Sequence, residues 1–534
     1  MEYLSLGIDF GTDSGRAVVV GTQTGNVIYS CQHSYPRWAE GKYCAPAQAE
    51  FHQHPLDYVE TLDTLLKEVA ANCPDLTAIK SIAVDSTCST PCLVDGTLTP
   101  LALRPEYAEN PGAMFVLWKD KSGFREAADL KARLSAADKP YLKHCGNTYS
   151  AEYTWSKILY QLNNHKELRK HAWAYLEEVD FLTSLLTGRT APDMKACIAP
   201  PTIKGLWSKE WGGFPVDEFR KIDPDLARIA ENTNYDFSSP GTRFGKLSDR
   251  YVREFGFSSD VTVATGAVDA HSGVIGSGSG ENTLAMSIGT SACYWLNFRK
   301  TAGFSICPDG LVGDADSIMV GDLHSTGVGL SAFGDIFAWF KNVLCWGRNA
   351  EDASGMIDSL SDAAANLPLN VRSVIATDHF NGRRSPFAND SIRAGMSGLS
   401  LSTTAPEIFR ALVEAAAFAT KASVAHLQAS GIRIDSYRAV GGVAVKSPYV
   451  MQVLADVLEA PVSVCSYTDI AARGAAVYGA VAAGIHESIP AAQAAMTENG
   501  SAAYTPCGDK ADYYRARYAR YRELVRFNEE LLND

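Results

Sequence analysis

Two stretches of the chain share one pattern of apolar and polar positions. Residues 3–21 (YLSLGIDFGTDSGRAVVVG) contain an apolar run, a turn rich in Gly, Thr, Asp and Ser, and a second apolar run. Residues 283–298 (TLAMSIGTSACYWLNF) repeat this order around a Gly-Thr-Ser turn. Each stretch predicts a β-hairpin whose tight turn exposes backbone N–H groups and hydroxyls. Isolated hairpins are common, but the similar chemistry and wide separation of these two indicate duplicated domains that face each other across a cleft.

Segments with a helical period alternate with short apolar segments elsewhere in the chain. Helices are predicted over 55–72 and 152–170, and strands over 78–84 and 261–264. This alternation favours an α/β architecture.

The domain boundaries are predicted from loop signals. A polar stretch at 232–241 ends in Ser-Ser-Pro-Gly, and we place the change of domain slightly after it. The predicted division is an N-terminal domain over 1–257, a C-terminal domain over 258–489 and a helical extension over 490–534. Residues 509–534 predict a helix rich in Tyr, Arg and Glu that packs on the outside of one domain, with its charges as a solvated face.

Composition and charge argue against several classes of protein. Of the 534 residues, 46% are hydrophobic and 20% are charged, which suits a globular protein with a large core. The net charge of −13 disfavours nonspecific binding to nucleic acid or to an anionic membrane, although local N–H groups and a metal can still hold phosphates. No apolar run reaches the ~18 residues of a membrane span, and the N-terminus does not resemble a signal peptide. We therefore expect a cytoplasmic protein without nucleic-acid or membrane partners.

Cysteine and histidine spacing gives no metal or disulfide signature. The 12 cysteines are scattered without CxxC spacing, which predicts reduced and mostly buried thiols. His52 and His54 lack an acidic or thiol neighbour in the sequence, so we expect them on the surface rather than in a metal site.

The first hairpin turn has the residue types of a phosphate site. Gly11 allows close approach of the backbone, and Thr12 and Ser14 add hydroxyl donors. Asp9 and Asp13 would repel a polyphosphate directly, so Mg²⁺ is the natural mediator. An ordinary acidic turn has the same composition and stays an equally open interpretation. The segment matches neither GxxxxGK[ST] nor GxGxxG, which argues against a P-loop and a Rossmann dehydrogenase.

Two further segments carry candidate chemistry. The glycine cluster at 439–447 (AVGGVAVKS) precedes a predicted helix over 448–458, and such a turn lets a flat base lie against the backbone, although it also suits an ordinary strand-to-helix connection. Asp269 follows an apolar strand among small residues and can project into a cleft. With a reference pKa near ~3.9 it is ionised at neutral pH and can accept the hydroxyl proton in phosphoryl transfer. A positioning role is favoured for the neighbouring His271.

In this order, the four segments resemble those of the FGGY carbohydrate kinases. The resemblance implies two ribonuclease-H-like domains of the actin and sugar-kinase ATPase fold, with ATP and sugar in the cleft between them. It implies Asp269 as the catalytic base and Asp9 as the residue that holds Mg²⁺, through water. The implied ATP phosphate-binding residues are Gly11, Thr12, Asp13, Ser14, Gly289, Thr290 and Ser291. The implied adenosine-binding residues are Gly441, Gly442, Lys446 and Ser447, although Val443 stands where many members have a third glycine.

Uncommon strings extend the resemblance along nearly the whole chain, to the members that phosphorylate ribulose. They are YPRW (35–38), DSTCSTP (85–91), RPEYAENP (104–111), AMFVLWKD (113–120), KGLW (204–207), SAFGDIFAWF (331–340) and FNGRRSP (380–386). The likeness implies that Lys204 lies beside the sugar and the transferring phosphate. It also implies that Cys88 lies in the loop that contacts the sugar.

One departure from those members concerns sugar binding. Gly327 stands where they have a glutamate that binds sugar hydroxyls, and Leu330 stands where they have a glutamine. A lost charge-assisted hydrogen bond weakens binding by roughly 1.5–3 kcal/mol, or the change suits a sugar of different stereochemistry. His324 and Asp322 are candidates to replace the contact.

The sequence therefore predicts ATP-dependent phosphorylation of a ketopentose at its terminal 5-hydroxyl, with L-ribulose first and D-ribulose next. The nearest alternative is a related kinase for xylulose, rhamnulose, glycerol or another polyol. Two further classes are less favoured: a non-catalytic sugar or nucleotide sensor, and an actin-like filament or chaperone ATPase. A homodimer is implied by the resemblance alone.

Overall fold

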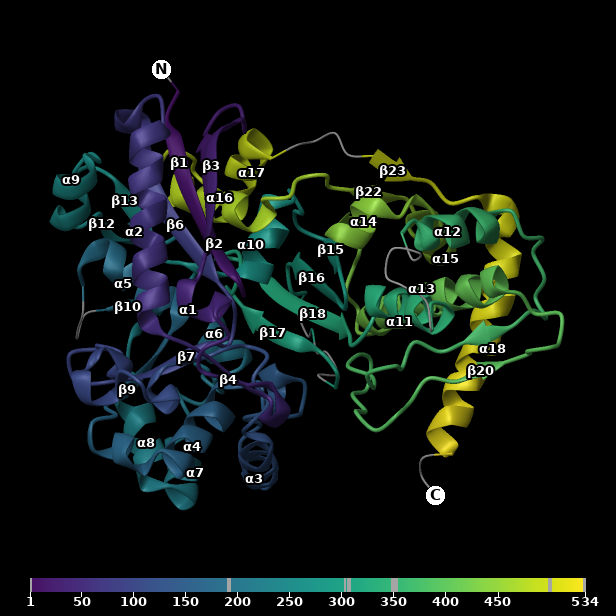
Figure 1. Cartoon of the computed structure of the whole chain (residues 1–534), viewed down its shortest axis with the longest axis horizontal. Helices are drawn as coiled ribbons and strands as arrows, with labels where there is room; N and C mark the ends of the chain where they lie inside the picture. Colours follow the sequence, from purple (N-terminus) through teal and green to yellow (C-terminus); the bar gives the residue numbers. More distant parts are fainter. Residues whose placement is uncertain are drawn as a thin grey trace. The chain divides into compact units, whose positions relative to one another are not determined.

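The chain forms two α/β units, which the computed structural model describes over residues 2–189, 194–301, 304, 309–346, 354–497 and 502–531 (Figure 1). Unit 1 comprises Met1–Gly280, Gly313–Ser325 and Asp469–Asn499. Unit 2 comprises Glu281–Val312, Thr326–Thr468 and Gly500–Asp534. Each unit is thus assembled from three separate segments of the chain.

This division differs from the boundaries expected from the sequence. Residues 258–280, expected in the second domain, belong to unit 1, because α10 (Asp269–Gly276) packs against α16 (Ile470–Ala482) of the same unit. The expected helical extension 490–534 divides between the units, and it contains the strand β23 (Ala502–Tyr504). As functional domains, 1–257, 258–489 and 490–534 stay a prediction.

Unit 1 is built on a mixed sheet. Its strands, in spatial order, are β12 (Arg243–Lys246), β13 (Thr262–Ala264), β6 (Ile79–Ser86), β1 (Leu4–Phe10), β2 (Ser14–Gly21) and β3 (Val27–Ser34), with β14 (Ala267–Val268) paired to β6. The strands β1 and β2 are antiparallel, and β6 and β13 run in the direction of β1. The hairpin predicted over residues 3–21 is confirmed.

Unit 2 repeats this plan. Its strands, in spatial order, are β18 (His324–Leu330), β16 (Ala292–Phe298), β15 (Thr283–Ile288), β21 (Ser436–Val440), β22 (Val462–Val464) and β23. The strand β17 (Val312–Asp316) is next to β18 in the sheet order, although Gly313–Ser325 is grouped with unit 1. An antiparallel hairpin, β15 and β16, is again followed by strands parallel to its first strand. The second predicted hairpin is confirmed, and the two sheets share one topology.

Of the two helices predicted from periodicity, one has the predicted bounds and the other ends earlier than predicted. The helix α2 (Pro55–Asn72) has the predicted bounds, whereas α4 (Thr154–Asn164) stops where His165 leaves the helical conformation, and a 3₁₀ turn over Lys166–Lys170 follows. The other helices of unit 1 are α1 (Pro36–Ala39), α3 (Phe124–Ser135), α5 (Glu178–Thr187), α6 (Ala199–Ile203), α7 (Val216–Ile222), α8 (Pro224–Asn232), α9 (Asp249–Phe255) and α17 (Ile489–Met496). Those of unit 2 are α11 (Gly334–Leu344), α12 (Met356–Ala365), α13 (Ala405–Ala429), α14 (Gly442–Lys446), α15 (Pro448–Leu458) and α18 (Ala511–Glu530).

Short strands, arranged in pairs and in one three-stranded sheet, complete the two units. In unit 1 they are β4 (Cys44–Ala45), β5 (Glu50–Gln53), β7 (Pro91–Val94), β8 (Phe115–Val116), β9 (Ala174–Glu177), β10 (Lys195–Cys197) and β11 (Asp236–Ser238), of which β4, β5 and β8 form the three-stranded sheet in the order β4-β5-β8. In unit 2 they are β19 (Ile375–Ala376) and β20 (Met396–Ser397).

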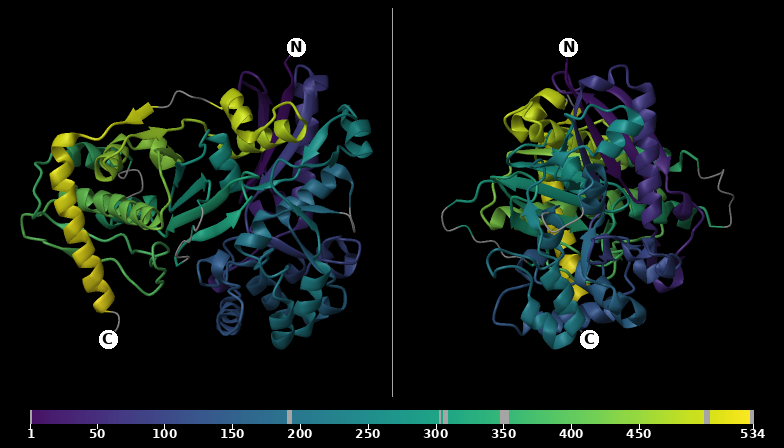
Figure 2. Two further views of the ribbon diagram at one scale, coloured as in Figure 1. Left: turned by 180° about the vertical axis from the view of Figure 1, so that it is seen from behind. Right: turned by 90° about the vertical axis from the view of Figure 1, so that its left-hand side faces the viewer.

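A late helix covers the first strand of unit 1. The helix α16 lies beside β1 although the two are far apart in the chain, as both views of Figure 2 show. A side chain on Gly7 of β1 would place its Cβ 1.7 Å from the carbonyl oxygen of Ala472, so only glycine allows this contact. The same holds where α16 crosses α10, because a Cβ on Gly474 would lie 1.9 Å from the carbonyl oxygen of Ser272.

The C-terminal helix α18 is only partly the solvated surface helix that the sequence predicts. Its Arg517 is fully buried and forms an ion pair with the buried Glu414 of α13, with 2.6 Å between Nη2 and Oε2. The hydroxyl of Tyr513 donates to the same carboxylate at 2.7 Å. The charged run is therefore divided between an exposed face and a face that anchors the helix in unit 2.

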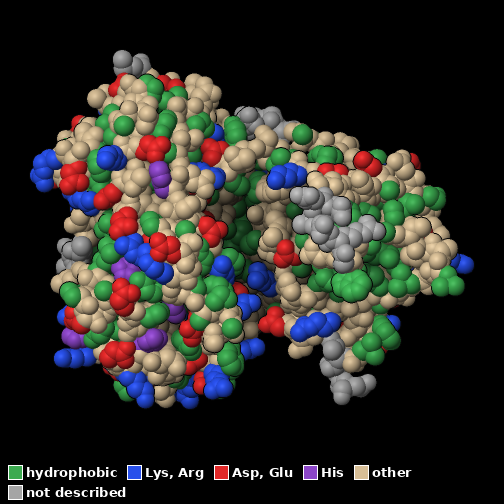
Figure 3. Space-filling model, viewed as in Figure 1, with side chains coloured by type: hydrophobic (Ala, Val, Ile, Leu, Met, Phe, Trp, Pro, Cys, Tyr) green, Lys and Arg blue, Asp and Glu red, His purple; other side chains and the backbone are tan. Residues whose placement is uncertain are grey.

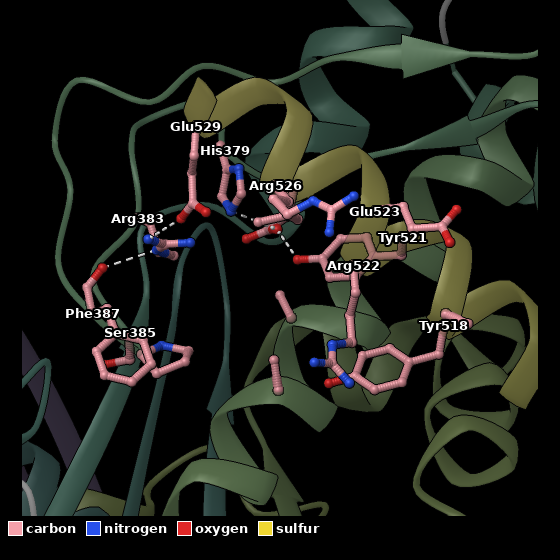
Figure 4. Close-up of a pocket in the computed structure, with 16 residues that line it drawn as sticks. His379, Arg383, Ser385, Phe387, Tyr518, Tyr521, Arg522, Glu523, Arg526 and Glu529 are labelled. Atoms are coloured by element: carbon pink, nitrogen blue, oxygen red, sulfur yellow. Dashed lines mark hydrogen bonds and ion pairs between the residues drawn. The ribbon is translucent and has the colours of Figure 1, made fainter. Parts of the chain in front are cut away.

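The exposed end of α18 borders a cavity of about 460 Å³ with the loop at 378–387 (Figure 4). Arg383 of the loop pairs with Glu529 at 2.5 Å, and the Tyr521 hydroxyl donates to Asp378 at 2.6 Å. These contacts attach the FNGRRSP segment to the C-terminal helix.

The distribution of surface charges and the state of the cysteines agree with the expectations for a globular protein with reduced thiols. Acidic and basic side chains are interspersed over the face shown in Figure 3. The cysteines of the described ranges are free, and each is buried or partly buried. In the same ranges, no helix has the length and apolarity needed to span a bilayer. The expected surface position of His52 and His54 is wrong: both are buried, and His54 accepts a hydrogen bond from the Leu56 N–H at the start of α2.

Candidate active site

Three aspartates lie at the carboxyl ends of neighbouring strands in unit 1. Asp9 of β1 is in register with Asp85 of β6, and Asp85 is in register with Ala267, two residues before Asp269. Residues in register on adjacent strands face the same side of a sheet, so the side chains of Asp9 and Asp85 lie together. The sequence patterns did not indicate Asp85, although it ends a predicted strand as Asp269 does.

Burial disfavours the charged forms of these carboxyl groups, and the charge of Asp9 adds to this effect at Asp85 and Asp269. Burial and then the charge of Asp9 raise the pKa of Asp85 well above its usual value. Burial also raises the pKa of Asp9. Burial and the charge of Asp9 raise the pKa of Asp269 to about 7, against the opposing effects of the Ala270 N–H and Lys204. The uncharged forms of these carboxyl groups are therefore favoured over what is usual for aspartate.

The first phosphate turn is supported by aromatic side chains from other segments. The turn between β1 and β2 consists of Gly11, Thr12 and Asp13 and continues into Ser14. The Trp118 indole N–H donates to the Thr12 hydroxyl at 3.0 Å, and the Trp38 indole N–H donates to Asp13 Oδ1 at 2.7 Å. Both tryptophans belong to the uncommon strings AMFVLWKD and YPRW, for which the sequence alone suggests no role.

Lys204 and Cys88, two residues that the resemblance assigns to the sugar, are in direct contact. Lys204 follows α6, and its Nζ donates to the Cys88 carbonyl oxygen at 2.5 Å. Burial raises the pKa of the Cys88 thiol, so the thiol is neutral. Burial lowers the pKa of His271 to about 3, so this imidazole is neutral as well, which favours positioning over proton transfer.

The second turn and the glycine cluster meet at one end of the unit 2 sheet. The turn Gly289–Ser291 follows β15, and its carbonyl groups accept hydrogen bonds at the start of α11, from Phe333 N–H to Thr290 at 2.8 Å and from Gly334 N–H to Gly289 at 3.0 Å. Gly441 has a φ of 97°, and a Cβ there would lie 2.7 Å from the carbonyl oxygen of Ile288 at the end of β15.

The rest of the glycine cluster leads into helices. Gly442 begins α14, and a Cβ there would meet no atom within 4 Å, so this face of the backbone is open. Lys446 ends α14 and is exposed, and Ser447 precedes α15. The four predicted adenosine residues therefore lie on one connection beside the second turn.

The position of Gly327 leaves no space for a larger side chain. A Cβ on this residue would lie 2.9 Å from the Trp295 ring and 2.9 Å from the Tyr294 carbonyl oxygen. Leu330 is 2% exposed in the core of unit 2. The two positions at which the resemblance implies a glutamate and a glutamine are thus part of the packed core.

His324 is already held by two carboxylates. Its Nε2 lies 2.6 Å from Asp314 Oδ1, and its Nδ1 lies 2.7 Å from Asp316 Oδ1. Burial lowers the pKa of His324, but the two aspartates together raise it above its usual value. Among the two candidates to replace the missing glutamate, His324 is therefore occupied, and Asp322 is exposed.

Comparison with known proteins identifies the class of enzyme. The chain is 35% identical to a ribulokinase of Vibrio parahaemolyticus over 98% of this chain and 96% of that protein, and 31% identical to a ribulokinase of Shouchella clausii over 98% and 95%. Its structure matches those of a xylulose kinase from Rhodospirillum rubrum (TM-score 0.82, 19% identity, covering 99% of this chain and 100% of that one) and a kinase described as a xyloylose kinase from Brucella ovis (TM-score 0.81, 20% identity, 99% and 100%). Residues 284–483 match the C-terminal domain of the FGGY family of carbohydrate kinases.

The protein is a carbohydrate kinase with the two-domain actin-like ATPase fold, and it uses ATP as a substrate. The chain belongs to the FGGY family of carbohydrate kinases. The predicted fold class and family are confirmed.

Proposed function

We propose that this kinase transfers the γ-phosphoryl group of ATP to the terminal 5-hydroxyl of a ketopentose, with L-ribulose as the first substrate and D-ribulose as the next. The observation that carries the proposal is the full-length likeness to relatives named ribulokinase. The presence of Asp269, Lys204 and both phosphate turns supports an active enzyme over a non-catalytic sensor.

In this proposal Asp269 accepts the proton of the 5-hydroxyl group. A pKa raised to about 7 places this base near the operating pH, which favours proton transfer. Lys204, which contacts the Cys88 loop, would offset negative charge on the transferring group, and that loop would contact the sugar. The two turns and the glycine cluster supply the phosphate and adenosine contacts, with the residues that the family resemblance implies.

The donor set in unit 1 fits Mg²⁺. Asp9 and the buried Asp85 are oxygen donors at neighbouring positions, and neither Asp85 oxygen has a hydrogen-bond partner of ordinary geometry in the described chain. In proteins, Mg²⁺ is usually bound by one or two carboxylates and keeps several water ligands. A site of this kind needs no cluster of three or more metal-binding side chains, and the described residues contain none. When bound, the ion would neutralise phosphate charge, and Asp9 would hold it.

Substrate profiling tests the proposed function. We expect ADP release from Mg-ATP to respond selectively to L-ribulose in a panel of L- and D-ribulose, xylulose, rhamnulose and glycerol. A response to another sugar alone would contradict the ribulose assignment, and a folded protein silent across the whole panel would favour a sensor.

Restoring the glutamate tests how the sugar site differs from its relatives. Gly327→Glu is expected to lower the free energy of unfolding by about 1–3 kcal/mol, because the new side chain meets Trp295 and Tyr294. Gly327→Ala, which adds the Cβ alone, is the control and should have a smaller effect in denaturant unfolding. A stable Gly327→Glu variant with a lower KM for L-ribulose would show that a glutamate side chain fits at this position and contacts the sugar, against the expected clash with Trp295 and Tyr294.

We also propose a cytoplasmic location and a homodimer. The location rests on the composition and the sequence patterns, and the homodimer rests on the family resemblance alone. Light scattering after size-exclusion chromatography tests the dimer, since a single species at the mass of one chain would exclude it.

A further inference from the structure

A second lysine lies behind the loop that carries Cys88. Lys157 of α4 is fully buried, and its Nζ donates to the carbonyl oxygens of Ser89 at 2.6 Å and Leu117 at 2.9 Å. Lys204 donates to the preceding carbonyl oxygen, that of Cys88. Two lysines therefore hold consecutive carbonyl groups of one short loop.

The other contact of Lys157 leads to the phosphate turn. Leu117 is followed directly by Trp118, whose indole N–H donates to the Thr12 hydroxyl. One ammonium group thus joins the loop that orients Lys204 to the segment that supports the first phosphate turn. These two parts of unit 1 must be correctly placed relative to each other for phosphoryl transfer.

A carboxylate holds the same loop from a second direction. Glu177 accepts hydrogen bonds from the Ser89 hydroxyl and the Thr90 N–H, both at 2.8 Å. Thr154, at the start of α4, bonds to both the Ser89 hydroxyl and Glu177, at 2.7 and 3.2 Å. The loop is therefore built into a polar network, with Lys157 as its buried cation.

Burying this ammonium group is costly, since both of its acceptors are neutral carbonyl groups. Burial, together with the charge of Lys204, lowers the pKa of Lys157 to about 8, against the opposing effects of Asp120, Glu177 and Glu152. The folded protein thus holds a lysine that loses its charge more readily than an exposed one.

We propose that Lys157 is a positioning residue for phosphoryl transfer, which fixes the Cys88 loop and the Trp118 segment relative to each other. The inference rests on the proposed roles of Lys204 and Thr12. It does not depend on which sugar is the substrate.

The test compares Lys157→Met with wild type, using whichever sugar the wild-type enzyme phosphorylates. We expect kcat to fall about 100-fold, the effect of misplacing reacting groups by about 1 Å, with the Kd for Mg-ADP and the Tm little changed. Lys157→Gln, which keeps amide donors, should recover part of the loss. Lys121→Met is the matched control, because Lys121 is exposed and pairs with Glu152 near α4.

The pH profile separates positioning from simple packing. The wild-type kcat should decline above about pH 8 as Lys157 loses its proton, and this decline should be absent from Lys157→Gln. The proposal is overturned by a Met variant with near wild-type kcat, by an unchanged alkaline decline in the Gln variant, or by loss of nucleotide binding in parallel with kcat. Should the Met variant fail to fold, kcat and the pH profile of the Gln variant decide. An inactive wild type across the sugar panel would instead count against the proposed function.

Discussion

Asp269→Asn is expected to lower kcat for sugar phosphorylation about 10²- to 10⁴-fold, the usual contribution of a general base. Asparagine keeps the shape of the side chain and an oxygen that can accept from the Ala270 N–H, but it cannot take the hydroxyl proton. Steady-state kinetics with saturating Mg-ATP would measure the loss, and binding of Mg-ADP should remain. The variant Asp236→Asn, at an exposed aspartate of the same unit, is the control.

The pH dependence of the wild type gives an independent check on the same base. Because the pKa of Asp269 is about 7 in the folded protein, kcat/KM for the sugar should fall as the pH drops below that value and the carboxyl group takes up a proton. The residual activity of Asp269→Asn should lack this acidic decline. A variant that retains wild-type turnover, with the decline intact, would show that another group is the base.

Arg517→Met is expected to lower the free energy of unfolding by about 3–5 kcal/mol, because it leaves Glu414 buried without its cation. Denaturant unfolding followed by circular dichroism would measure the change. Arg515→Met is the matched control: Arg515 is on the same helix but pairs with Glu459 at the surface, where such pairs contribute at most about 1 kcal/mol.

A double variant separates the ion pair from the rest of the helix. Arg517→Met combined with Glu414→Leu removes both charges and should be more stable than Arg517→Met alone. If the single variant loses no more stability than Arg515→Met, the pair does not anchor α18.

Local sequence patterns were sufficient for much of the fold. The two hairpins, the bounds of α2 and the strand, glycine turn and helix around Gly441 all depend on neighbouring residues, and all are confirmed. The early end of α4 at His165 and the burial of His52 depend on packing, which the helical period and the spacing of histidines do not encode.

The candidate site residues were proposed from their own residue types and from the family resemblance, whereas the contacts that support them were not predicted. The residue types predicted for a phosphate turn around Thr12 are local in the sequence, but Trp118, which donates to the Thr12 hydroxyl, lies 106 residues away. Lys157 and Ser89 are 68 residues apart, and Arg517 and Glu414 are 103 apart. Pairings at such separations are set by the tertiary fold, so a single sequence gives no signal for them.

The packing of α16, which comes late in the chain, on the first strand β1 affects how the protein folds during synthesis. The Ser5 hydroxyl donates at 2.7 Å to the carbonyl oxygen of Ala476, which is 471 residues later. At the ~5–20 residues per second of protein synthesis, the first strand waits roughly half a minute to a minute and a half for its cover to leave the ribosome. Unit 2 also needs its last segment, from Gly500 onward. Both units therefore reach completion at nearly the same time, only after these segments have been made, and the nascent chain has to keep the apolar β1 protected until then.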